Sequence, residues 1–141
     1  MRIPWLTPGA INCRRSAANG DLVMSNNDLM HAIDTQLAHV WMVRAFLKHS
    51  EEAAEDDELA EVHRELYDFM LALGGPLKNG DTDEYLRLAG KKFSKLKRAT
   101  ELFVKIQPEV SQHTNFSMAA ASLTAAVTEV GRLLESARPL N

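Results

Sequence analysis

Histidine side chains can bind a metal ion or transfer a proton, and the sequence contains five of them. They are His31, His39, His49, His63 and His113. His31 with Asp34, and His49 with Glu52, have the i,i+3 spacing of paired ligands, but both pairs point away from the apolar side of the predicted helix. A di-metal helical bundle needs a Glu-x-x-His pair on each of two helices, and no Glu-x-x-His occurs in the sequence. We therefore expect no metal site and no cofactor.

Arg44 departs most from its surroundings, because it falls near the middle of an apolar helical stripe. Burying a guanidinium without a partner is costly. The aliphatic stem of Arg44 can instead carry the charge to the surface, where the ring of Trp41, one helical turn earlier, can form a cation–π contact with it. In an antiparallel register Arg44 would lie level with His63. The candidate counter-ions are Glu61, Glu65 and Glu129. A structural ion pair or an outward-reaching arginine is one interpretation, and a ligand or anion pocket built on Arg44, His63, Glu129 and Trp41 is the other.

Arg44 and His49 also have an Arg-x4-His spacing, which resembles the motif of the HEPN ribonuclease families. Those families are helical bundles, and the resemblance implies RNA cleavage at a cleft made by dimerisation, with both side chains acting on the 2′-OH and phosphate. Only these two residues match. The families carry the motif late in the chain with a polar residue after the arginine, whereas here it is early and Ala45 follows. A regular helix separates the two positions by about 140°, so a shared site needs a bend or a second subunit.

Basic residues gather on one face of the segment 82–107. They are Arg87, Lys91, Lys95 and Arg98. Phosphate binding is conceivable there, but no aromatic residue interleaves to stack on bases, and the net charge of the chain is −3. The acidic run at 51–58 would lie near the same end and balance this charge. We therefore expect no nucleic-acid partner.

The elements that position these residues are four amphipathic helices, at 25–50, about 57–73, 82–107 and 114–137. Gly74-Gly75-Pro76 and Pro108 are expected to end the second and third helices. Short connections and the absence of a strand pattern predict an all-α protein, an up-down-up-down antiparallel four-helix bundle. The alternative is a pair of hairpins that complete their core only on dimerisation.

Composition favours one soluble domain, since 141 residues are 45% hydrophobic and 25% charged. The single Cys13 excludes an internal disulfide and suggests a reducing, cytoplasmic location. No apolar run approaches the ~18 residues of a membrane helix, so no membrane is expected. Residues 1–24 lack periodicity and form a predicted irregular or disordered arm ahead of a bundle at 25–138. Met24 precedes a capped helix, so translation starting there is an alternative.

Apolar residues outside the core stripes predict an association surface. They are Met42, Phe46, Leu88, Leu102 and Ile106. The last helix adds a ridge of small side chains at Ser117, Ala121, Thr124 and Thr128, which would permit close helix approach. No set of nucleophile, base and oxyanion donors converges in the sequence. We therefore expect a protein without catalysis of its own, which forms homodimers and contacts a protein partner that the sequence does not identify.

Overall fold

The computed structural model describes residues 24–137, and every regular element in that range is a helix. The predicted all-α class is therefore confirmed for this part of the chain. Residues 1–23 and 138–141 lie outside the described residues, and with them nearly all of the predicted N-terminal arm. The helices are α2 (Asn26–Lys48), α3 (Glu51–Glu55), α4 (Asp57–Asn79), α5 (Thr82–Val110) and α6 (Thr114–Glu135).

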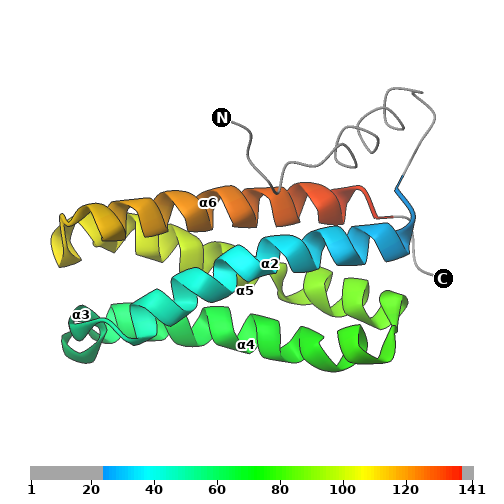
Figure 1. Cartoon of the computed structure of the whole chain (residues 1–141), viewed down its shortest axis with the longest axis horizontal. Helices are drawn as coiled ribbons and strands as arrows, with labels where there is room; N and C mark the ends of the chain where they lie inside the picture. The colour runs from blue at the N-terminus through cyan, green and yellow to red at the C-terminus, as the bar shows by residue number, and fades with distance from the viewer. Residues whose placement is uncertain (1–23, 138–141) are drawn as a thin grey trace, which may run out of the picture.

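The four long helices lie side by side, and each packs against two neighbours (Figure 1). Helix α2 contacts α4 and α6, and α5 contacts the same two helices from the other side. Helix α2 also meets α5 across the core and α3 beyond its C-terminal end. This helix thus touches every other helix, which explains why its apolar residues are not confined to one stripe.

The core between these helices is almost entirely aliphatic and aromatic. Its largest fully buried side chains include Tyr85, Phe103, Leu29, Ile33 and Leu123. Only Thr100 and Gln107 are buried polar residues within the described range, and both hydrogen-bond locally. The core of the described residues therefore contains no cluster of polar side chains.

Two short connections shape the start of α4. Helix α2 ends at Lys48, and the hydroxyl of Ser50 then accepts a hydrogen bond from the Ala53 amide at 3.2 Å to begin α3. One residue after α3, the Asp56 carboxylate accepts from the Leu59 amide at 3.0 Å and caps α4. Glu51–Glu55 of the acidic run thus form a separate short helix, which the sequence did not predict, while Asp57 and Glu58 begin α4.

The predicted end of α4 is wrong, because the Gly-Gly-Pro sequence at 74–76 lies inside the helix. Leu77 is half-buried against the core and holds the last turn in place. The helix ends instead at Gly80, whose φ of 66° only glycine adopts freely. There the Gly80 amide donates to Leu77 O at 3.2 Å and the Asp81 amide donates to Pro76 O at 2.9 Å, which is a Schellman cap.

Pro108 likewise lies inside the last turn of α5, which extends to Val110 rather than to 107. The Ser111 amide donates to Gln107 O at 3.0 Å, and the Gln107 side chain donates back to Ser111 O at 2.8 Å. Pro108 removes the amide donor to Val104 O and crowds that carbonyl, but the Gln107–Ser111 hydrogen bonds and the half-buried Val110 hold the last turn.

Candidate functional site

Arg44 lies at the seam between α2 and α4, where its guanidinium packs against two aromatic rings. Its guanidinium carbon is 4.7 Å from the ring centroid of Trp41 and 4.6 Å from that of Tyr67. The two ring centroids are 6.3 Å apart and tilted by 45°. The contact with Trp41 agrees with the sequence interpretation, whereas Tyr67 was missed. Its signal was available, because Tyr67 follows His63 by four residues and shares its helix face.

No carboxylate within residues 24–137 lies at ion-pair distance from Arg44. Its Nε atom is buried and has no hydrogen-bond partner in this range. Glu129, a predicted counter-ion and ligand residue, instead pairs with Arg132 on its own helix, where it accepts two hydrogen bonds. The predicted ion pair is therefore wrong, and the aromatic rings take the place of a carboxylate.

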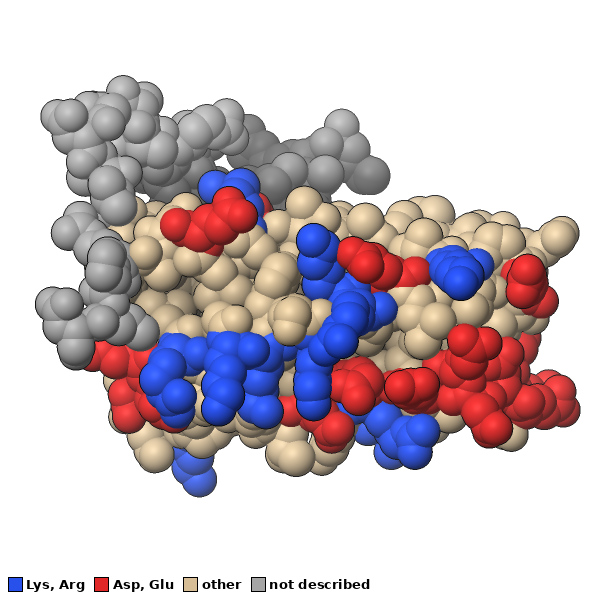
Figure 2. Space-filling model, turned by 180° about the vertical axis from the view of Figure 1, so that it is seen from behind, with Lys and Arg blue, Asp and Glu red and all other residues tan. Residues whose placement is uncertain are grey.

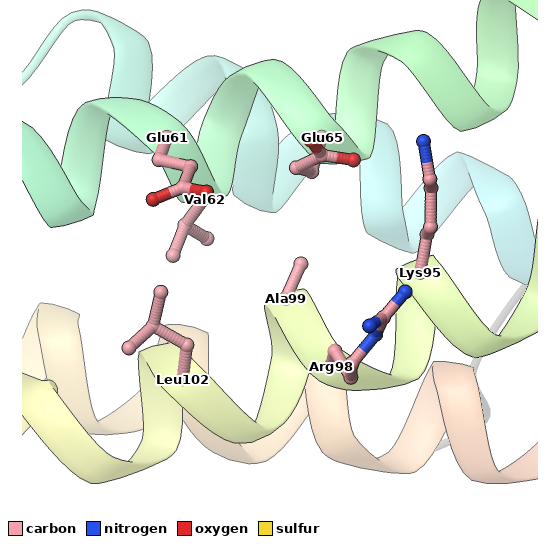
Figure 3. Close-up of a pocket in the computed structure, with 7 residues that line it drawn as sticks. All are labelled: Glu61, Val62, Glu65, Lys95, Arg98, Ala99 and Leu102. Atoms are coloured by element: carbon pink, nitrogen blue, oxygen red, sulfur yellow. The ribbon is translucent and has the colours of Figure 1, made fainter.

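Glu61 and Glu65, the other predicted counter-ions, face α5 rather than α2 (Figure 3). They line a depression of about 280 Å³ opposite Lys95 and Arg98 of α5. Opposite charges thus meet across this seam, although no ion pair closes between them in the described structure. A mixed, open patch of this kind is ordinary surface electrostatics.

His63 is half-buried and lies close to several cations. Burial lowers the pKa of His63, and the positive charge of Arg44 lowers it further. Arg64 and Lys48 act in the same direction. Arg44 therefore lies near enough to His63 to act on its charge, and burial and these cations disfavour the protonated histidine.

An apolar groove of about 410 Å³ runs along the α2–α4 seam from this corner. Its lining residues are almost all apolar. They are Asp34, Leu37, Ala38, Trp41, Tyr67, Met70, Leu71, Leu73, Gly74 and Leu77. Trp41 and Tyr67, which both pack against Arg44, therefore also form one end of the groove.

The two residues of the Arg-x4-His spacing are not brought together within the described chain. His49 is exposed and follows the last residue of α2, while the Arg44 guanidinium packs against Trp41 and Tyr67. No hydrogen bond or ring contact joins their side chains within residues 24–137. No group of three or more His, Cys, Asp or Glu in that range could hold a metal ion. None of the described helices is both long and apolar enough to cross a membrane.

The predicted association residues differ widely in exposure. Met42 is 67% exposed, but Ile106 is only 7% exposed and belongs to the core, so its predicted place on an outer face is wrong. Leu88 and Leu102 are half-buried against that core. Phe46 is also half-buried, since its ring packs edge-on against Phe116 of α6 with centroids 5.0 Å apart. Only Met42 of this set is largely open to solvent.

A broader uncharged surface surrounds Met42 on the α2–α6 side. Met42, Phe46 and Met118 line a shallow depression of about 330 Å³, and Met118 is 62% exposed. The sequence from Thr114 to Thr128 contains no Asp, Glu, Lys or Arg. Its outward residues are Thr114, Asn115, Ser117, Met118, Ala121, Ser122, Thr124, Ala125 and Thr128, all exposed. The predicted small-residue ridge is part of this surface.

The opposite side of the molecule is charged. Figure 2 shows Lys and Arg side chains gathered across that face, with Asp and Glu crowded toward one end. Arg87, Lys91, Lys95 and Arg98 are all exposed, as expected of an outward face, and Arg87 pairs with Glu84 at 2.6 Å. Charged side chains of both signs therefore cover this face, whereas α6 carries none from Thr114 to Thr128.

No protein-family model, curated protein or solved structure matches this chain.

Proposed function

We propose that this is a non-catalytic helical-bundle protein that acts through homodimerisation and protein contacts made by the α2–α6 surface. The carrying observation is that α6 presents an exposed face without a charged residue from Thr114 to Thr128. Charged residues are depleted at the cores of protein interfaces, whereas ordinary solvated helix faces carry them.

The shape of this surface also supports a helix partner. Small side chains such as Ala121 and Ala125 let two helix backbones approach closely, as they do in tightly packed helix pairs. Met42 and Met118 at its edge are flexible and adapt to an apposed surface. A two-fold dimer would set α6 against α6, because the commonest assembly uses the same patch on both subunits.

We also propose how the long helices are arranged and in which compartment the protein acts. Short connections between consecutive long helices favour an up-down-up-down antiparallel four-helix bundle spanning about 25–138 as one domain. The cytoplasm is the proposed compartment, because Cys13 has no cysteine in its own chain to pair with. The partner beyond a second copy is a protein whose contact surface is uncharged and apolar.

Sedimentation equilibrium of the full chain with Met42→Asp and Met118→Asp tests this proposal. Both side chains are largely exposed, so the variants should fold, and each should shift the mass toward a monomer. Leu71→Asp is the matched control, since Leu71 is 63% exposed but lies on α4 away from this surface. Phe46→Asp is less suitable, because it would break the packing on Phe116. A monomeric wild type, or dimers that survive both Met substitutions, would refute the proposal.

A further inference from the structure

The α2–α4 seam combines two chemistries that the dimer proposal does not use. At one end, Arg44, Lys48 and Arg64 place positive charge around His63. From there an apolar groove of about 410 Å³ extends away along the two helices. The seam therefore has a cationic end and an apolar groove, and Trp41 contacts Arg44 and also lines the groove.

We propose that this groove binds a free, single-chain carboxylate amphiphile, with its carboxylate on Arg44 and its alkyl chain along the groove. The volume lies within the range of about 300–1,000 Å³ that small-molecule sites occupy. The ligand class follows from charge complementarity at one end and apolar lining along the rest.

The head-group site follows from the way Arg44 is held. Trp41 and Tyr67 both lie against its guanidinium, and its Nε atom is buried, which leaves the edge formed by the two Nη groups for a ligand. No described residue accepts a hydrogen bond from that edge. A planar carboxylate matches two parallel N–H donors of arginine, and the rings limit the rotamer entropy that binding would otherwise cost.

The direction of the chain follows from Asp34 at the far end of the groove. Asp34 precedes Trp41 by seven residues, which corresponds to about 10 Å along a helix. Its negative charge disfavours a carboxylate there and favours one beside Arg44. Between the two ends, Ala38, Met70 and Gly74 offer only apolar or small surface to the ligand.

The burial of the lining favours an inserted chain over a flat bilayer or a second copy. Leu37 and Leu73 are buried at the floor, and Met70 and Leu77 are half-buried. Trp41 and Leu71 at the rim are exposed and can contact a membrane or a partner subunit, but neither of these would reach the buried and half-buried side chains below the rim. An alkyl chain can instead reach them from solvent.

Decanoate below its micellar concentration is the probe, titrated into the full chain carrying Trp5→Phe so that Trp41 alone reports by fluorescence. We expect saturable quenching or enhancement with decanoate and weaker binding of uncharged decanol. Arg44→Met should reduce the preference for decanoate over decanol by roughly tenfold, because the charge-assisted pair is lost. Equal binding of decanol and decanoate by the unmodified site would overturn the head-group assignment.

Gly74→Met and Gly75→Met form the matched pair for the groove itself. A Cβ added at either position meets no atom within 4 Å, and both glycines are exposed on α4, so both variants should fold. Only Gly74 lines the groove, so Gly74→Met should weaken decanoate binding by about tenfold or more and Gly75→Met should not. Equal affinities in the two variants would overturn the proposal.

Two further measurements exclude the other occupants. If the Trp41 signal appears only with anionic phospholipid vesicles and not with decanoate, a bilayer is the ligand and the proposal fails. If Gly74→Met converts dimers to monomers in sedimentation, a second copy occupies the groove and the proposal fails. Met42→Asp should leave decanoate binding unchanged, so failure of the dimer proposal is distinguishable from failure of this one.

Discussion

Replacing Tyr85 by Phe should stabilise the protein, because the hydroxyl is buried without a hydrogen-bond partner. Tyr85 is fully buried, and its Oη atom forms no hydrogen bond with any residue in the range 24–137. Burial, and then the negative charge of Asp34, raise the pKa of Tyr85 well above its ordinary value. The hydroxyl therefore stays neutral and contributes a desolvation cost without a compensating bond.

The magnitude follows from two opposing terms. An unsatisfied buried hydroxyl costs about 1–3 kcal/mol, and Phe removes that cost. The void left by one oxygen atom, at about 24 cal/mol per Å³, takes back only about 0.3 kcal/mol. We therefore expect the free energy of unfolding to rise by about 1–2 kcal/mol, which corresponds to an increase in Tm of about 3–8 °C for a domain of this size.

Urea unfolding followed by circular dichroism measures this change, with the m-value checked for constancy between variants. Tyr67→Phe is the control, because it removes the same atom from a half-buried ring, and it should change stability by less than about 0.5 kcal/mol. A loss of more than about 1 kcal/mol in Tyr85→Phe would contradict the reasoning, since it would mean that the hydroxyl is bonded in solution.

Three other substitutions test packing and electrostatics separately. Gly90→Ala should stabilise α5 by about 0.5–1 kcal/mol, because the added Cβ meets no neighbouring atom. Gly131→Ala should destabilise α6, because its Cβ would lie 2.8 Å from the Phe93 ring. Changes of the same sign in the melting temperatures of the two variants would contradict this reasoning. The pKa of His63 is lowered in the folded state, so the unfolded chain takes up the proton first as pH falls below the ordinary value of 6.5. The free energy of unfolding should therefore decrease as the pH falls from 6.5 to the lower pKa of the folded state. In urea titrations over this pH range, His63→Gln should lose less stability than the wild type. Parallel curves of stability against pH for the two proteins would exclude the effect.

The apolar periodicity was sufficient to place the long helices, but local terminators were overridden. Gly-Gly-Pro at 74–76 is a strong stop signal, yet Leu77 gains burial only if the helix continues for another turn. Gly80 then provides the left-handed residue that a Schellman cap needs. The competition between local propensity and tertiary packing decides such an end, and only the former is visible in a sequence.

The register argument placed Arg44 near His63, but it did not predict that Glu61 and Glu65 face α5. Arg44 does lie near His63, as the antiparallel register indicated. Glu61 and Glu65 occupy the same level of α4 but lie two residues from His63 on either side, which turns them about 160–200° around the helix and toward α5. A register argument predicts how far along the helix axis a residue lies. The rotation of each helix about its own axis depends on packing that a single sequence does not specify.

Ile106 illustrates the same limit for the predicted association surface. A single-stripe reading of α5 leaves Ile106 outside, but α5 packs against α4, α6 and α2 together, so its buried arc is wider than one stripe. The uncharged face of α6, by contrast, is readable from the sequence, because the absence of charge over several turns does not depend on the rotation of the helix.

The geometry of α2 makes the two proposed surfaces independent of each other. Trp41 and Met42 are neighbours in the sequence, but successive residues diverge by about 100° around a helix, so one borders the α4 seam and the other borders the α6 seam. Each residue is exposed, and neither lines the other's depression. A dimer formed through α6 would therefore leave the cationic end of the groove open. Affinity for decanoate that depended on protein concentration would show instead that the two seams are coupled through α2.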